Sequence, residues 1–256
     1  MRIGIEGGLP PTVQTVSDIH RAQHYTIPFE NFDVHLPAPY SFSPDHLFDK
    51  MITRRRGGFC YELNLLLAYA LRTSGYEVDV LSGQLWHKDF FGEPFDHMVT
   101  RVRADDGEML ADVGNAETMQ RPIRLDGSWN EQERGGAYRV TEHLGSAAVE
   151  YRDAAAKKTE VRYLFDHRPR QPHEFGEMLH FHTKSPDSQF AKGWLCTLPR
   201  GADGRITVSR GMLMETRSGR MERRALRSAA DLTTVLVEEF GMKPFPVPTG
   251  WFRRQD

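Results

Sequence analysis

Apolar positions recur at helical spacing through the first part of the chain. The pattern predicts a short helix over 15–24, which ends before Pro28. A second helix is predicted over 43–52, because a serine, a proline and an aspartate open it as cap, first residue and first-turn acid. A third begins at about Cys60 and continues until Gly75 supplies a stop. The first 75 residues are therefore predicted to be helical.

Beyond Gly75 the pattern changes to short runs rich in β-branched and aromatic residues, separated by turn signals. These runs predict a small antiparallel sheet or barrel, with strands at 78–86, 97–102, 109–113, 138–140 and 161–165.

The tripeptide Asp105-Asp106-Gly107 predicts a tight turn, so that 97–104 and 108–113 form a hairpin. His97 and Asp112 then lie toward the same open end. Their unequal distances from the turn require a bulge or a slanted pairing to align them.

The C-terminal part combines strands with one helix. Two strand-like segments flank Ser218-Gly219, a helix is predicted over 228–240, and residues 244–256 are expected to form an extended tail. Together with the preceding patterns, this predicts a protein of the α+β class.

Composition describes an ordinary globular chain of 256 residues, long enough to bury a sizeable core. A net charge of −2 gives no reason to expect nucleic acid or an anionic membrane as a partner. Cys60 and Cys196 are too few for a disulfide framework, and we find no secretory signal, so we expect a cytoplasmic protein. The apolar run 65–71 is too short to span a bilayer.

The segment "RRRGGFCYEL" (54–63) places Cys60 where a helix begins. Free N–H groups and the partial positive charge of a helix N-terminus favour a thiolate, so we expect an exposed Cys60 with a lowered pKa. The glycines let the backbone approach closely and turn sharply. The three arginines either add positive field or are simply solvated. The alternative is that Cys60 is a small buried hydrophobic residue.

A nucleophilic cysteine needs a base, and the base needs a group that fixes its tautomer. Among eleven histidines, His97 is the strongest candidate because it opens a strand and shares a predicted hairpin with Asp112. Asp96 is a rival orienting group, although adjacent residues in a strand point to opposite faces.

Two further patterns are weaker. His180-Phe181-His182 resembles a metal-binding pair, but no cysteine or carboxylate completes a ligand set, so we predict a strand with polar positions and no metal. Gly57-Gly58 beside arginines suggests a phosphate cradle, but the lysine and hydroxyl of a phosphate loop are missing.

Several of these segments, taken in order, resemble the arylamine N-acetyltransferase family. The spacing of Cys60, His97 and Asp112 fits the family as well, and the likeness covers nearly the whole chain. The segments that carry it are "IPFENFDVHL" (27–36), "RRGGFCYELN" (55–64), "DHMVTRV" (96–102), "ADVG" (111–114), "HFHTKSPDSQF" (180–190), "DGRITV" (203–208) and "VEEFGM" (237–242).

The resemblance implies a three-part architecture around a cysteine-protease-like Cys-His-Asp core. We expect an N-terminal helical bundle over 1–75, a central antiparallel β-barrel-like domain over 76–185, and a C-terminal α/β lid with its tail over 186–256.

The resemblance also implies an N-acyltransferase. Cys60, His97 and Asp112 are expected to form a catalytic triad, in which Cys60 takes an acetyl or other short acyl group from coenzyme A and a small aromatic amine then accepts it. This ping-pong scheme needs no bound cofactor, since acetyl-coenzyme A is a substrate. The expected oligomeric state is open.

The substrate pocket departs from the family pattern. Relatives commonly read Asp-Val-Gly-Phe-Gly, whereas this chain reads Asp112-Val113-Gly114-Asn115-Ala116, so that an aromatic wall is altered. Phe29 matches another aromatic residue of that pocket. Phe29 and Asn115 are therefore the expected substrate contacts.

Three alternatives remain open. The same triad occurs in amide synthases of polyketide assembly, whose acyl chain comes from a carrier protein. A papain- or transglutaminase-like hydrolase presents cysteine, histidine and aspartate in the same order, although "IPFEN" and "RRGGFCYELN" argue against it. The last is a binding module that keeps the fold without activity.

Overall fold

The structure is a computed structural model that describes residues 2–5, 10–37, 39–115, 119–155 and 158–252. The chain folds into two compact units. The first contains Ile3–Gln23 and Cys60–Leu179, and the second contains Arg2, His24–Phe59 and His180–Asp256. Each unit has its own sheet and core, and the predicted α+β class is confirmed. The division at 75 and 185 stays a prediction.

Two of the helices begin directly after a serine that caps them, and the first of these caps was predicted. Ser43 Oγ accepts a hydrogen bond from the His46 N–H at 3.3 Å, and Ser228 Oγ accepts one from the Asp231 N–H at 3.1 Å. In the described residues the α-helices are α1 (Val13–Thr26), α2 (Pro44–Phe48), α3 (Cys60–Thr73), α4 (Gly176–Lys184) and α5 (Ala229–Glu238). A π-helical turn, Asp49–Thr53, continues α2, and short 3-10 helices lie at Phe32–Val34, Pro172–Phe175 and Thr249–Phe252. These described helices are all too short or too polar to cross a membrane.

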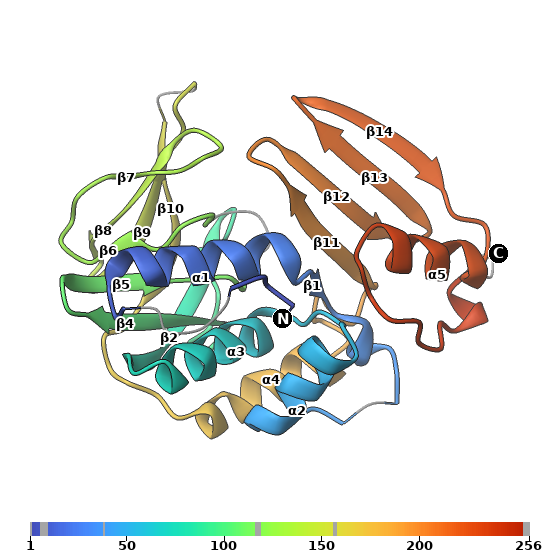
Figure 1. Ribbon diagram of the computed structural model, residues 1–256, viewed down its shortest axis with the longest axis horizontal. Coiled ribbons are helices and arrows are strands. Elements are labelled where there is room, and N and C mark those ends of the chain that lie inside the picture. The colour runs from blue at the N-terminus through green and yellow to red at the C-terminus, as the bar shows by residue number, and fades with distance from the viewer. Residues whose placement is uncertain (1, 6–9, 38, 116–118, 156–157, 253–256) are drawn as a thin grey trace. The chain divides into compact units, whose positions relative to one another are not determined.

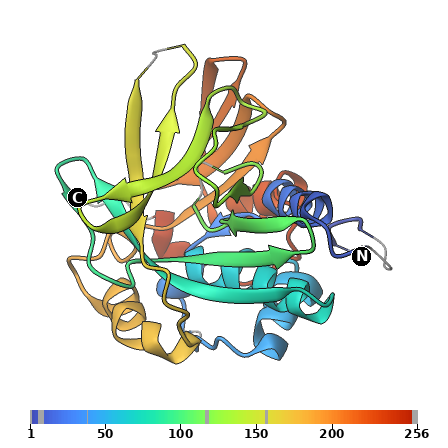
Figure 2. The same cartoon turned by 90° about the vertical axis from the view of Figure 1, so that its left-hand side faces the viewer.

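The first unit is built on an antiparallel sheet in the order β6-β5-β4-β2-β10-β9-β8-β7, with β3 paired to β2. Figure 2 shows β4 and β5 (green) nearly level and β10 (yellow) standing steeply across them, so the sheet curls strongly. Its strands are β2 (Glu77–His87), β3 (Phe90–Phe91), β4 (His97–Ala104), β5 (Gly107–Ala111), β6 (Ile123–Arg124), β7 (Asn130–Glu131), β8 (Ala137–His143), β9 (Ser146–Arg152) and β10 (Thr159–Phe165).

Helix α3 packs against β2 and β4, as Figure 1 shows. Its leucines are fully or almost fully buried, and each contributes about 1.5–3 kcal/mol of hydrophobic stabilisation. A cluster of buried side chains joins the strands of the sheet and includes Leu81, Val99, Leu110, Ile123, Tyr138, Val149, Tyr163 and Phe165. This packing places the start of α3 beside the start of β4.

The predicted hairpin around Asp105-Asp106 is confirmed as β4–β5. Its pairing is regular from Thr100↔Ala111 to Ala104↔Gly107, so the expected bulge is absent from these pairs. Asp112 directly follows Ala111, and His97 is the first residue of β4, so both lie at the end of the hairpin away from the turn.

The second unit contains a five-stranded antiparallel sheet in the order β1-β11-β12-β13-β14. Its core gathers buried side chains of the sheet, α5 and Phe32, and the hairpin around Ser218-Gly219 is confirmed. All six residues of β14, the last strand in this order, are exposed. The strands are β1 (Phe29–Glu30), β11 (Leu195–Arg200), β12 (Gly204–Ser209), β13 (Met212–Arg217) and β14 (Arg220–Ala225).

Three sequence predictions are wrong. Residues 180–182 lie in α4 rather than in a strand, because Glu174 Oε2 accepts the Gln171 N–H and opens a helical turn that runs into α4. The first 75 residues are not all helical, since β1 pairs with β11. The described part of the tail ends in a 3-10 helix, and Trp251 stacks on Trp194 with ring centroids 5.2 Å apart.

Candidate active site

Cys60 is the first residue of α3, as predicted, but its side chain is only 4% exposed. The glycines before it have a steric reason. A Cβ on Gly57 would lie 2.1 Å from the Pro28 carbonyl oxygen, and the Gly58 carbonyl accepts the Glu30 N–H at 2.9 Å. Only glycine allows this close approach of the chain that leads into the cysteine.

His97 and Asp112 form a buried pair. His97 Nε2 lies 2.8 Å from Asp112 Oδ2, and the two side chains are 1% and 0% exposed. Gly83 is opposite His97 on β2, and a Cβ there would come within 3.3 Å of the His97 Cβ. The glycine therefore leaves room for the histidine at this end of the sheet.

The second oxygen of Asp112 is held by three donors. Oδ1 accepts hydrogen bonds from Asn64 Nδ2 at 2.9 Å, from the Gly114 N–H at 2.9 Å and from the Asn115 N–H at 3.2 Å. Burial alone would raise the pKa of Asp112, but the charge and hydrogen bond of His97, with these donors, lower it below its usual value. Asp112 is therefore a fixed anion at neutral pH.

The environment of His97 raises its pKa from 6.5 to about 10. Burial opposes the charged ring, but the Asp112 carboxylate and the interaction with the Cys60 thiol outweigh burial. His97 Nδ1 is buried and makes no hydrogen bond of normal geometry with the residues described. One nitrogen thus faces the carboxylate, and the other is left for proton exchange with the thiol.

The expectation of an exposed cysteine with a lowered pKa is wrong. Burial raises the pKa of Cys60, and the hydrogen bond and charge of His97 offset this only in part. The reason is that the buried thiol loses its hydration, and the Asp96 and Asp112 charges also disfavour the thiolate. Thiolate formation at Cys60 therefore depends on His97.

Asn64 is a residue of the site that the sequence analysis did not single out. It stands one helical turn after Cys60, donates to Asp112 Oδ1 and to the Met98 carbonyl, and accepts the Val113 N–H. A Cβ on Gly114 would lie 2.6 Å from Asn64 Nδ2 and 2.7 Å from the Cys60 Cα. The available signal was the spacing of four residues within "CYELN", which places both side chains on one helix face.

Two further aromatic rings enclose the pair and were also missed. The ring of Tyr163 lies 5.5 Å from that of His97, and its buried hydroxyl has a pKa raised well above the usual value by burial and by Asp112. Burial lowers the pKa of His20 to about 4, although the charge and backbone of Asp112 and the backbone of Gln120 oppose this. Both groups therefore stay neutral at neutral pH, beside a carboxylate that is itself fully buried.

Asp96, the rival to Asp112 as the group that orients the His97 ring, pairs with a different histidine. Its Oδ2 lies 3.1 Å from His87 Nε2 instead. Phe29, one expected substrate contact, lies in the second unit with its ring 6.1 Å from that of Phe190. Asn115 lies beside Asp112, and Ala116 falls outside the described residues.

The three arginines before the glycines behave differently from one another. Arg56 is 5% exposed, and its guanidinium donates to Glu30 Oε1 at 2.9 Å and to Asp33 Oδ1 at 2.7 Å. Arg54 pairs with Asp49 at the surface, at 2.8 Å. Arg56 is thus part of a buried charge cluster in the second unit, and the alternative that all three are simply solvated is wrong for it.

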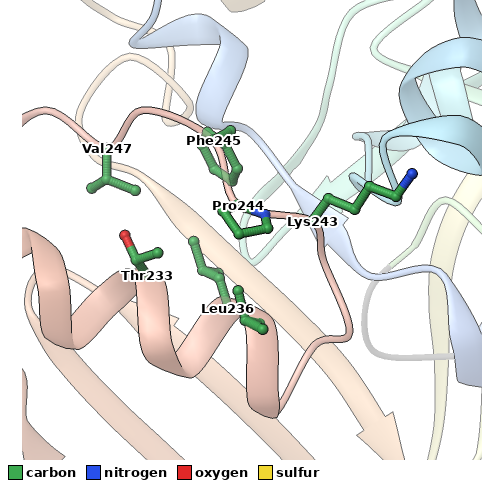
Figure 3. Close-up of a pocket in the computed structure, with 7 residues that line it drawn as sticks. Thr233, Leu236, Lys243, Pro244, Phe245 and Val247 are labelled. Atoms are coloured by element: carbon green, nitrogen blue, oxygen red, sulfur yellow. The ribbon is translucent and has the colours of Figure 1, made fainter.

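The other hollows and side-chain clusters of the described residues are weaker candidates for a functional site. A small apolar hollow of the second unit lies between α5 and residues 243–247 (Figure 3), where the hydroxyl of Thr233 and the amine of Lys243 point in different directions. In the described ranges no three histidine, cysteine, aspartate or glutamate side chains gather as metal ligands would. Cys196 is buried in β11, and burial raises the pKa of its thiol well above the usual value.

Comparison with known proteins gives one consistent family. A family model described as N-acetyltransferase matches residues 12–244. The arylamine N-acetyltransferase of Mycolicibacterium smegmatis is 32% identical over 94% of this chain and 89% of its own length. The arylamine N-acetyltransferase / N-hydroxyarylamine O-acetyltransferase of Salmonella typhimurium is 30% identical over 91% of this chain and 83% of its own. The solved Mycobacterium marinum arylamine N-acetyltransferase in complex with CoA superposes with a TM-score of 0.81 at 29% identity, covering 94% of this chain and 90% of its own.

Proposed function

Because the chain belongs to the arylamine N-acetyltransferase family, we propose that it moves an acetyl or other short acyl group from coenzyme A to an aromatic amine through an acyl-cysteine. The observation that carries the proposal is the buried pair of His97 and Asp112 beside Cys60, at the first residue of α3. The relatives named above are arylamine N-acetyltransferases, and the Mycobacterium marinum protein was solved with CoA.

In the first half-reaction, the Cys60 thiolate attacks the carbonyl carbon of the acyl thioester. The C–S bond to coenzyme A breaks, His97 delivers a proton to the departing sulfur, and an acyl-Cys60 remains. Backbone N–H groups at the start of α3 stabilise the negative oxygen of the tetrahedral intermediate.

In the second half-reaction, the amine nitrogen attacks the acyl-Cys60 carbonyl. His97 accepts the proton that the nitrogen loses, the C–S bond to Cys60 breaks, and the amide leaves. Asp112 keeps His97 Nε2 engaged throughout, so that Nδ1 faces the reacting atoms. Exchange between two thioesters is nearly balanced in energy and amide formation is downhill, so no nucleotide is consumed.

The acceptor side is the part that the chain alters. We assign Phe29 as an aromatic contact of the acceptor and Asn115 as a polar one, where relatives carry phenylalanine. A polar residue at this wall favours an acceptor less fully aromatic than those of the relatives. It also keeps a carrier-bound acyl donor, as in amide synthases, as the second candidate.

The experiment is intact-protein mass spectrometry after brief incubation with acetyl-coenzyme A and no amine. We expect the mass of one acetyl group to be gained by the wild type and by Cys196→Ala, to be absent from Cys60→Ala, and to be lost when an aromatic amine is added. A wild type that gains no acetyl group, or a Cys60→Ala variant that keeps full activity, contradicts the proposal.

A further inference from the structure

Phe95, two residues before the base His97, holds an unusual backbone conformation. It is the third residue of a turn from Glu93 to Asp96, closed by a hydrogen bond from the Asp96 N–H to the Glu93 carbonyl at 3.0 Å, with Pro94 second. Its φ is +70°, in the left-handed region. A turn with proline second and positive φ third normally carries glycine or asparagine there, because a Cβ is strained in this region.

Two hydrogen bonds hold the backbone of Phe95 in place. Its N–H donates to Ser82 Oγ at 2.8 Å, and its carbonyl accepts from the Tyr61 hydroxyl at 2.5 Å. Its ring is fixed as well, because it lies edge-on to Phe175 at 5.1 Å and carries the Arg170 guanidinium at 5.1 Å. Strain of this kind persists only where the surroundings over-determine it.

Tyr61 and Ser82, which we call the clamp, hold Phe95 through these two hydrogen bonds. The clamp residues and Phe95 are chain neighbours of residues at the candidate site. Tyr61 follows Cys60 on α3, and its side chain is 0% exposed. Phe95 precedes His97 by two residues. Ser82 precedes Gly83, which is the β-pair of His97. The hydrogen bond from Tyr61 to Phe95 therefore links the residue beside the nucleophile to the turn that delivers the base.

We propose that Phe95 is a strained pivot that sets the ring of His97 against the thiol of Cys60. Tyr61 and Ser82 are the positioning residues that hold the pivot. If the clamp opens, the φ of Phe95 relaxes to a negative value and the chain enters β4 in another direction. His97 then loses its alignment with the thiol, although the Asp112 pair persists.

The clamp acts through geometry, so its loss lowers turnover rather than substrate affinity. A displacement of the base by a fraction of an ångström is enough to reduce the rate by about tenfold. The turnover readout rests on the proposed function. A second readout, alkylation of the Cys60 thiol by iodoacetamide at neutral pH, needs no acyl substrate.

The test begins with Tyr61→Phe, which removes the hydroxyl and keeps the ring. We expect kcat for amine acetylation and the alkylation rate of Cys60 each to fall about tenfold, with KM for acetyl-coenzyme A nearly unchanged. The matched control is Tyr76→Phe, because the Tyr76 hydroxyl also donates to backbone carbonyls, of Pro10 at 3.1 Å and Thr12 at 3.2 Å. It should lower the melting temperature and leave kcat and alkylation unchanged.

The pivot is tested directly with Phe95→Gly, since glycine takes a positive φ without strain and needs no clamp. In this background Tyr61→Phe should reduce kcat and alkylation by less than about threefold, so that the two changes are coupled. Equal losses in both backgrounds, or a Tyr61→Phe variant that loses only melting temperature as Tyr76→Phe does, overturn the pivot. A wild type that forms no acetyl-enzyme contradicts the proposed function, while the alkylation rates still decide the pivot.

Discussion

Asn64 donates to Asp112 across the site, with Nδ2 and Oδ1 2.9 Å apart. The helix that presents the thiol and the loop that carries the carboxylate are therefore joined by a buried hydrogen bond. Asn64 Oδ1 also accepts the Val113 N–H, so this one side chain holds both the carboxylate of Asp112 and the backbone of the residue after it.

We predict that Asn64→Ala lowers the free energy of unfolding by about 3 kcal/mol, because it leaves buried donors and acceptors without partners. Urea denaturation measures this value. Gln14→Ala is the control, since it removes an exposed amide-to-carboxylate hydrogen bond, from Gln14 Nε2 to Asp18 Oδ1 at 2.8 Å. Equal midpoints for the two variants would contradict the prediction.

Gly114→Ala should reduce kcat by about a hundredfold, because its Cβ would collide with Asn64 and with the Cys60 backbone. Steady-state kinetics on the folded variant measures the loss. Gly176→Ala is the matched control, since nothing lies within 4 Å of the position of its Cβ and its φ is not positive. It should keep full activity, and comparable activity in both variants would sink the steric argument.

The His97 pair makes stability depend on pH in the alkaline range. The pKa of His97 is raised from 6.5 to about 10 in the folded chain, so the unfolded chain loses this proton first as the pH rises. The stabilisation is complete below pH 6.5 and disappears as the pH rises to about 10. The raised pKa of Cys60 acts in the same direction.

We therefore expect wild-type stability to fall between about pH 6.5 and 10, and His97→Asn to show a much flatter profile. Urea titrations at several pH values measure both. Cys60→Ala, which keeps the His97–Asp112 pair, should retain most of the fall. The lowered pKa of Asp112 adds a separate loss in acid, below its ordinary value of 3.8. Parallel alkaline profiles for the wild type and His97→Asn would rule out this linkage.

The buried charges of the second unit give a fourth prediction. Arg56→Ala should cost about 3–5 kcal/mol, because Glu30 and Asp33 stay buried without this cation. Arg54→Ala, two residues away, removes an exposed ion pair and should cost about 0–1 kcal/mol. Chemical denaturation compares them, and similar losses would show that burial does not decide the effect.

Local signals predict most of the elements that carry the candidate site. The serine cap before Pro44, the turn at Asp105-Asp106 and the start of α3 at Cys60 all depend on neighbouring residues, and all are found. His97 and Asp112 can be paired from the sequence because a hairpin brings its own ends together.

Features that depend on distant partners have no such local signal. Strand β1 pairs with β11, which lies far along the chain, so the short Phe29–Glu30 run carries no strand signal of its own. The burial of Arg56 depends on Glu30 and Asp33, and the raised pKa of Cys60 depends on its burial, which neighbouring residues in the sequence do not reveal. Strands β9 and β11 were not predicted, and the π-helical turn after α2 interrupts a pattern typical of one continuous helix.

Strand β14 is the last strand in the order of its sheet, and this position affects whether the protein aggregates at high concentration. An exposed edge strand presents unpaired backbone N–H and C=O groups, which can pair with a second chain and lead to aggregation. Here the strand carries Arg220, Glu222, Arg223 and Arg224, all exposed. If two copies paired through this strand, their arginines would lie close together and would lose hydration. The strand therefore protects itself against aggregation through its own side chains, without a covering helix.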